Sequence, residues 1–284
     1  MQPSWARDVW RVLEPYHTVC YFAPEPAAQL KALGLKGFWM GYFAARAAPF
    51  GAAGPELVTA TFFGFHPAMV RRALPDAWGY ADPQATLDAR LAGVDAALRR
   101  LLGDLVDDPS LDEAADLAAR AAHSAAPAGR PLYAATSALP WPEPAHLRLW
   151  HAAGLLREYR GDGHIAALTA AGVDGAAAHV LLVAAGLAPR ELLQSVRGWD
   201  DDDWAAATAR MVERGWLGPD GGFTESGRLA RERIEQITDE CALPPLEVLG
   251  DAGTQRLIEL ATPATARIVD DGGFLVPNPI GLTR

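Results

Sequence analysis

The sequence predicts a mainly helical protein built from two divergent winged-helix-like repeats, the second of which keeps a short β-hairpin wing. Three observations indicate this class. Apolar side chains recur at helical spacing along most of an alanine-rich chain of 284 residues. A tryptophan and arginine pattern occurs twice. A segment rich in Gly and Asp, residues 216–224, separates two helical stretches near the end of the second copy.

The repeated pattern is W-x6-R. Trp39 is followed seven residues later by Arg46, and Trp150 is followed at the same distance by Arg157. In both copies a spacer of similar length leads to the motif T-x-x-G-hydrophobic-[H/D]-[P/G]-A, which occupies residues 61–68 and 169–176. A repeat on this scale indicates an internal duplication.

The first half of the chain contains a series of predicted helices. Residues 4–14 carry an apolar stripe, and Pro15 is expected to end that helix because proline lacks the backbone N–H. Residues 37–48 form an aromatic-rich helix, and two longer helices follow over residues 84–102 and 111–123. In the repeated motif, His66 stands at the start of a helix in the first copy.

The second half shows the order of elements of a winged helix-turn-helix. A helix over residues 146–160 is expected to break at 161–163, where the sequence is Gly-Asp-Gly. A helix over residues 200–214, the hairpin at 216–224 and a last amphipathic helix over 225–238 complete the pattern. The helix over residues 200–214 would then be the recognition helix.

Composition shifts give the domain boundaries. Residues 127–144 carry five prolines and few periodic apolar positions, which is typical of a linker. The predicted organisation is a first helical repeat, a degenerate winged helix, at 1–126; a Pro-rich linker at 127–144; a second repeat at 145–250; and a C-terminal helix with an extended strap at 251–284.

Several runs resemble known families. The pairs Gly198-Trp199 and Asp203-Trp204, with ERGWL at 213–217 and FTESGR at 223–228, resemble the wing region of MarR-type regulators. GYFAARAAP at 41–49, WHAA at 150–153, RGDGH at 160–164 and PNPIG at 277–281 resemble an actinobacterial helix-turn-helix family of unknown function. The resemblance implies a fold and implies no particular reaction.

Charge and cysteine content limit the functional class. A formal net charge of -10 and a pI near 5.1 disfavour a protein whose main role is to hold a polyanion. Two distant cysteines, Cys20 and Cys241, indicate neither a disulfide framework nor a CxxC site. The start of the chain lacks the pattern of a signal peptide, and the longest apolar run, 176–188, is too short to cross a bilayer. We therefore expect a cytoplasmic protein with no membrane segment.

The expected recognition helix is a poor match for DNA. It begins with four consecutive aspartates, 200–203, and offers only Arg210 and Arg214 further along. Phosphates would repel that end of the helix. A structural explanation suffices, because an Asp N-cap and acidic residues in the first turn stabilise a helix. DNA binding is therefore disfavoured.

Arg46 and Arg157 are the first candidate ligand-binding residues. If the two copies pack around a pseudo-twofold axis, both guanidinium groups would converge on one cleft and bind a carboxylate or phosphate. The alternative is a structural ion pair for each arginine, with Glu56 for the first and with Asp162 or Glu158 for the second.

Four histidines are further candidates. His164 follows the Gly-Asp-Gly segment and could act as a general base positioned by Asp162. His17 could donate or accept a hydrogen bond to a ligand, His151 neighbours Trp150, and His66 could also line the site. No histidine spacing is typical of a metal site, so no metal is predicted, and the cofactor is left unknown.

The leading hypothesis is that the protein binds a small anionic or aromatic molecule in a cleft between the repeats. The sequence does not decide whether it is also an enzyme. Trp39, Tyr42 and Trp150 would form the apolar wall. A ligand-responsive DNA-binding regulator is the first alternative, and a His-dependent metal or haem enzyme is the second. A homodimer is left open.

Overall fold

The computed structural model describes residues 1–282, which consist of helices joined by short connections. The predicted mainly helical class is confirmed. The chain divides into two compact units. Unit 1 comprises Met1–Gly54, Ala73–Gly163 and Asp239–Leu275, and unit 2 comprises Pro55–Arg72, His164–Thr238 and Val276–Arg284.

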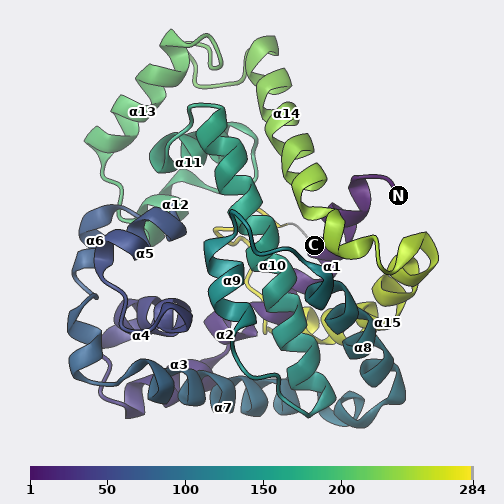
Figure 1. Cartoon of the computed structure of the whole chain (residues 1–284). Coiled ribbons are helices and arrows are strands. Elements are labelled where there is room, and N and C mark those ends of the chain that lie inside the picture. The colour runs from purple at the N-terminus through teal and green to yellow at the C-terminus, as the bar shows by residue number, and fades with distance from the viewer. Residues whose placement is uncertain (283–284) are drawn as a thin grey trace. The chain divides into compact units, whose positions relative to one another are not determined.

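Unit 1 contains most of the helices. Those that lie wholly within it are α1 (Ser4–His17), α2 (Val19–Phe22), α3 (Pro24–Ala32), α4 (Gly37–Ala47), α7 (Pro83–Leu102), α8 (Pro109–Ser124), α9 (Pro131–Ser137) and α15 (Gly250–Asp270), with the 3-10 turns η1 (Ala48–Phe50), η2 (Asp76–Gly79), η3 (Gly103–Asp107) and η4 (Pro244–Leu246). Helix α7 runs along the base of this unit and packs against α3 and α4 (Figure 1).

Two helices connect the units along the chain. Helix α10 (Ala145–Ala170) begins in unit 1 and ends in unit 2. Helix α14 (Glu225–Ala242) begins in unit 2 and ends in unit 1. The predicted break of α10 at residues 161–163 is wrong, because the helix is continuous through this segment. The segment predicted as a linker, residues 127–144, contains helix α9.

Helix α1 continues past Pro15, where the sequence predicted its end. A proline removes one N–H from the ladder, and near the C-terminus of a helix little of the helix remains to be disrupted. The last turn closes through the bond from the Thr18 N–H to the Glu14 carbonyl, 2.9 Å. Tyr16 and His17 are both buried, so tertiary packing holds this turn in place.

The core of unit 1 contains many alanines. Helix α8 presents a row of them toward α15, and all are at most 1% exposed: Ala114, Ala115, Ala118, Ala121 and Ala122. Small side chains allow two helices to approach closely, while the larger leucines of α7 fill the remaining space.

Unit 2 is a smaller helical body. Besides the ends of α10 and α14 it contains α5 (Pro55–Phe62), α6 (Pro67–Arg71), α11 (Gly175–Ala184), α12 (Arg190–Arg197) and α13 (Asp201–Glu213). Helix α11 packs against α13 (Figure 1). Leu181, Leu193, Trp204 and Met211 lie in one core.

Both motif segments of the repeat form a helix, a tight turn and a second helix. The side chain of His66 caps α6 by accepting from the N–H of Ala68 at 3.1 Å. Asp174 caps α11 by accepting from the N–H of Ala177 at 2.9 Å. These are the two equivalent positions of the sequence motif, and each one starts a helix as predicted.

The predicted β-hairpin wing does not form strands. In residues 1–282 the segment shows one isolated antiparallel bridge, between Leu217 and Phe223. The Gly218 N–H donates to the Gly222 carbonyl at 2.8 Å, so the chain reverses at once. Too few residues face each other across the turn to make a ladder, and the segment is a tight loop between α13 and α14.

No single helix within residues 1–282 is long and apolar enough to cross a membrane; α10 and α11 reach that length and composition only as a pair, bent by 96°.

Candidate functional site

In unit 1, helices α1 and α4 and the first part of α10 bring two arginines and two carboxylates together. The Nη2 group of Arg46 donates to Oε2 of Glu158 at 3.1 Å. The Nη1 group of Arg157 donates to Oε1 of the same carboxylate at 2.9 Å, and its Nε donates to Oε1 of Glu14 at 2.9 Å. The two arginines of the repeated W-x6-R pattern therefore meet at one glutamate.

The carboxylates lie deeper than the guanidinium groups. The side chains of Glu14 and Glu158 are 0% and 7% exposed, whereas those of Arg46 and Arg157 are 14% and 18% exposed. Tyr42 is half-buried beside the arginines. The accessible rim of this group is therefore cationic and aromatic, while its negative charges are covered.

Electrostatics keep these groups ionised despite burial. Burial alone would raise the pKa of Glu158, but Arg46 and Arg157 outweigh it and lower the pKa to about 2. Burial disfavours the charged form of Arg157, but Glu14 and Glu158 raise its pKa well above the ordinary value. A buried carboxylate is stable here because each oxygen has a cationic partner.

Aromatic rings surround the charged group. The ring of His17 stacks on Trp150, with centroids 5.8 Å apart and planes 8° apart. Tyr21 meets His17 edge-on at 5.7 Å and contacts Tyr42 at 5.1 Å. Trp39 extends the group, because its ring contacts Tyr42 at 5.5 Å. We call the four charged side chains and these five rings the Arg-aromatic cluster.

His17 is held as a neutral ring inside this cluster. Its Nε2 lies 3.5 Å from the hydroxyl of Tyr21 and 3.9 Å from Sγ of Cys20, and its buried Nδ1 has no partner. Burial, followed by the charge of Arg157, lowers the pKa of His17 well below the ordinary value. Burial also raises the pKa of Cys20 to about 12, so that side chain is a thiol and not a nucleophilic thiolate.

Arg90 belongs to the same region, although it was not among the residues predicted from the sequence. Its guanidinium carbon lies 5.4 Å from the centre of the Trp150 ring, and its Nη1 donates to the carbonyl of Ala45 at 2.9 Å. The signal was available in the sequence, since Arg90 falls between Thr86 and Val94 at a spacing of four residues on the buried stripe of α7. An arginine on an apolar stripe is unusual enough to identify a site.

The remaining predicted residues lie elsewhere. Oδ2 of Asp162 accepts from the N–H groups of Leu132 and Tyr133, at 3.1 and 3.0 Å, and so caps α9. His164 belongs to unit 2, where its Nδ1 lies 2.9 Å from Oγ1 of Thr238. The carboxylate of Asp162 therefore has a structural role in unit 1, and the proposed acid–base pair with His164 stays a prediction.

Two other histidines have structural surroundings. His151 packs edge-on against Trp141 at 4.7 Å, and burial, followed by the charge of Arg90, lowers its pKa to about 4. His66 belongs to unit 2, where its ring meets Trp199 at 4.9 Å and its Nε2 lies 3.7 Å from Asp203. Within residues 1–282 no group of three His, Cys, Asp or Glu side chains could hold a metal ion.

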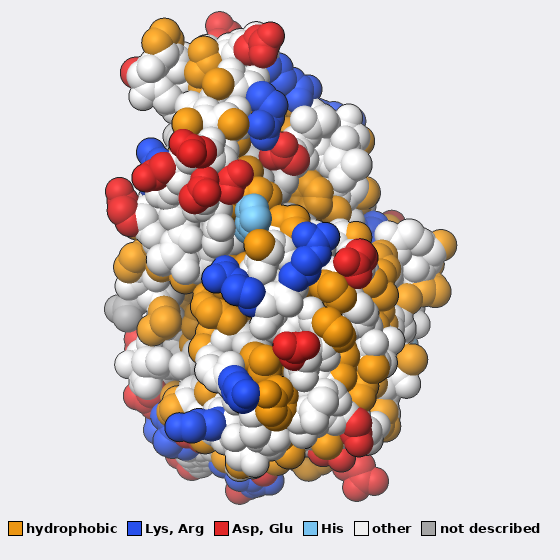
Figure 2. All heavy atoms as spheres, turned by 90° about the vertical axis from the view of Figure 1, so that its left-hand side faces the viewer, with side chains coloured by type: hydrophobic (Ala, Val, Ile, Leu, Met, Phe, Trp, Pro, Cys, Tyr) orange, Lys and Arg blue, Asp and Glu red, His pale blue; other side chains and the backbone are white. Residues whose placement is uncertain are grey.

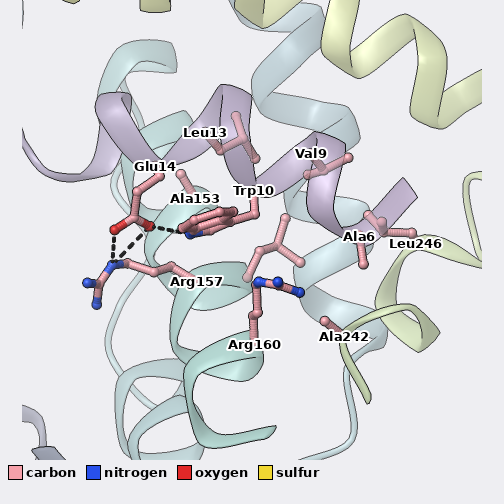
Figure 3. A pocket seen from close by; sticks show the side chains of 11 residues that line it. Ala6, Val9, Trp10, Leu13, Glu14, Ala153, Arg157, Arg160, Ala242 and Leu246 are labelled. Carbon is pink, nitrogen blue, oxygen red and sulfur yellow. Dashed lines mark hydrogen bonds and ion pairs between the residues drawn. The ribbon is translucent and has the colours of Figure 1, made fainter. Parts of the chain in front are cut away.

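A small hollow adjoins the Glu14–Arg157 pair in unit 1. Figure 3 shows Trp10 of α1 and Arg157 and Arg160 of α10 at this hollow, with aliphatic side chains that include Val9 and Leu13 of α1, Ala242 of α14 and Leu246 of η4. The indole N–H of Trp10 donates to Oε2 of Glu14 at 3.0 Å. The volume is about 20 Å³, enough for roughly one water molecule and too small for an organic ligand.

Unit 2 carries the predicted helix-turn-helix elements α12 and α13. The start of α13 is acidic, and Asp200 and Asp203 form a reciprocal capping box there. Arg210 of α13 and the C-cap residue Arg214 both have partners. Arg210 pairs with Asp174 at 2.6 Å, and the guanidinium group of Arg214 lies 3.8 Å from the centre of the Trp216 ring. Acidic side chains gather on the face that carries α13 (Figure 2). Few cationic groups of this helix are therefore free for phosphates.

The geometry defines an all-helical protein with a helix-turn-helix body and an Arg-aromatic cluster. A family model described as a helix-turn-helix family matches residues 6–275, nearly the whole chain. The protein belongs to this helix-turn-helix family. No curated protein and no solved structure matches the chain.

Proposed function

We propose that this protein binds a small organic anion with a flat apolar part at the Arg-aromatic cluster of unit 1. The observation that carries the proposal is the convergence of Arg46 and Arg157 on Glu158 beside half-buried tyrosines. Six residues proposed from the sequence as ligand-binding or catalytic belong to this cluster, and they are His17, Trp39, Tyr42, Arg46, Trp150 and Arg157.

The cluster is suited to such a ligand for two physical reasons. Planar guanidinium groups bind carboxylates through two parallel N–H bonds, and this geometry is more specific than a point charge. Tyr21 and Tyr42 are half-buried, so their rings can cover an apolar surface and still present hydroxyl groups. The adjoining hollow is too small to compete as the ligand site.

Calorimetric titration tests the proposal. The probes are benzoate, phenylacetate and indole-3-acetate, each compared with its neutral amide. We expect at least one acid to bind at least tenfold more tightly than its amide. Arg157→Lys keeps the charge but loses the planar fork, and it should weaken binding about tenfold while the protein stays folded by circular dichroism.

The control is Arg256→Lys, because Arg256 is exposed and pairs with Glu113 far from the cluster in sequence. It should bind the acid as the wild type does. Equal affinity for acid and amide would overturn the proposal, and so would an Arg157→Lys variant that binds normally.

DNA binding is the second candidate function, and membership of a helix-turn-helix family supports it. The order α12, α13, tight loop and α14 agrees with the resemblance to MarR-type regulators. The acidic start of α13 and the engaged Arg210 count against it. A mobility-shift assay at low salt with the promoter of its own operon separates the two functions, and we expect no specific shift.

A further inference from the structure

The charges of the cluster do not balance once Arg90 is included. Three guanidinium groups face two carboxylates, and burial keeps His17 neutral. The cations are Arg46, Arg90 and Arg157, and the anions are Glu14 and Glu158. One positive charge among these five side chains is therefore left without a counter-charge.

Arg90 is the group that holds the excess charge. Arg46 and Arg157 each pair with a carboxylate, whereas the contacts of Arg90 are neutral, namely the Ala45 carbonyl and the Trp150 ring. Within residues 1–282 no carboxylate pairs with it, and its buried Nε has no hydrogen-bond partner. An unpaired buried cation is costly, and such departures from ordinary packing are expected at functional sites.

The surroundings of Arg90 belong to the same cluster. The ring of Trp150 contacts both the guanidinium group of Arg90 and the ring of His17. The charge of Arg90 also acts on two neighbours: it adds to the lowering of the His17 pKa by burial and Arg157, and it opposes the rise that burial causes in the pKa of Cys20. Arg90 is only half-buried as a residue, so part of its surface remains accessible.

We propose that Arg90 is the residue that receives the ligand's carboxylate, and that the ligand is a monoanion. This inference rests on the proposed function. A single negative charge would balance the cluster, whereas a dianion would leave an excess negative charge next to Glu14 and Glu158. Arg157 keeps the role in anion binding proposed above, beside Arg90, and Arg46 and Arg157 also neutralise the two glutamates.

Substitution of Arg90 should affect stability and ligand binding differently from substitution of an ordinary structural arginine. Removal of Arg90 takes away a buried charge with no counter-charge, so the folded protein should become no less stable. The same change removes the partner of the ligand. Stability and binding should therefore respond in opposite directions, as is common for residues kept for function.

The test uses the full chain and three probes at pH 7: benzoate as monoanion, phthalate as dianion and benzamide as neutral analogue. The variants are Arg90→Met and a matched control on the same helix, Arg99→Met, whose side chain is exposed and pairs with Asp95. Affinity is measured by calorimetry and stability by thermal unfolding.

We expect the wild type to bind benzoate at least tenfold more tightly than phthalate or benzamide. Arg90→Met should lose at least tenfold in benzoate affinity and should melt at the same temperature or higher, while Arg99→Met binds as the wild type does. If benzoate binds but Arg90→Met binds it equally well, or if phthalate is preferred, only this inference is overturned. If the wild type binds none of the three, nor the acids named above, the proposed function falls as well.

Discussion

Arg46 and Arg157 bind opposite oxygens of one carboxylate, that of Glu158. The distances are 3.1 Å from Arg46 Nη2 to Oε2 and 2.9 Å from Arg157 Nη1 to Oε1. The two arginines lie 111 residues apart and occupy the same position in the repeated W-x6-R pattern. A single buried glutamate therefore connects helices α4 and α10, and its removal should affect both.

We predict that Glu158→Gln destabilises the protein by about 3–5 kcal/mol, because two largely buried guanidinium groups lose a shared counter-charge. Urea unfolding followed by circular dichroism measures the change. Glu113→Gln is the matched control, since Glu113 pairs with Arg256 on the surface and its loss should change stability little. Equal effects of the two substitutions would contradict a structural role for the buried pair.

Two glycines of α10 should respond in opposite ways to alanine. At Gly161 a new Cβ would lie 3.7 Å from Oε2 of Glu158, an ordinary contact, so Gly161→Ala should stabilise the helix by about 1 kcal/mol. At Gly163 a Cβ would overlap Nη1 of Arg130. That guanidinium cannot move away freely, because it donates to the carbonyls of Tyr159 and Cys241 at 2.7 and 2.9 Å.

Gly163→Ala should therefore destabilise the protein by about 1–3 kcal/mol, as overpacking does. Both variants are compared by urea unfolding, and each serves as the control for the other. Stabilisation by both would show that Arg130 adapts at little cost.

The same segment shows why the sequence predicted α10 incorrectly. Gly-Asp-Gly favours a turn by local propensity, and the sequence offers no local reason for a helix. The helix continues because two of these residues, Asp162 and Gly163, have partners elsewhere in unit 1. Asp162 caps α9, and Gly163 leaves room for Arg130. Local propensity could not reveal either partner, since both lie about thirty residues earlier in the chain.

The candidate site was partly predictable. The repeated pattern selected Arg46 and Arg157, and the structure brings both to Glu158, which was one of the partners considered for Arg157. Glu56, the partner considered for Arg46, lies instead 3.8 Å from Arg71. Glu14 was not foreseen, because it is 143 residues from Arg157 and only the packing of α1 brings it close.

Asp162 should make stability depend on pH. Burial raises its pKa to about 6, above the value near 4 of an unfolded aspartate. The folded state therefore binds the proton more tightly, so this group contributes stability below about pH 4 that is lost as pH rises to about 6. Both of its bonds to α9 reach the single oxygen Oδ2, which the amide oxygen of asparagine can replace.

Asp162→Asn should accordingly gain stability relative to the wild type as pH rises from 4 to 6, and the difference should be constant above about pH 7. Urea unfolding at pH 4, 5, 6 and 7 gives the four differences. Asp116→Asn is the control, because the Asp116 side chain is 66% exposed. A difference between Asp162→Asn and wild type that does not change with pH would contradict the assignment.

His179 of unit 2 should act in the opposite sense. Its Nε2 and the indole N–H of Trp199 both lie 2.8 Å from the carbonyl of Gly64. Burial, followed by the charge of Arg197, lowers the pKa of His179 to about 4, although the bond to Gly64 opposes this shift. Since the folded pKa lies below the ordinary value near 6.5, the stability from neutral His179 is present above pH 6.5 and is lost as pH falls toward 4.

We predict that His179→Gln reduces the loss of stability between pH 6.5 and 4, because the amide can donate to the same carbonyl and does not titrate in this range. Trp199→Phe removes the other donor without changing any charge, so it should lower stability by a similar amount at every pH. Unfolding in urea at half-unit steps of pH measures both. If His179→Gln and the wild type lose stability in parallel as the solution is acidified, another group is responsible for the acid sensitivity of unit 2.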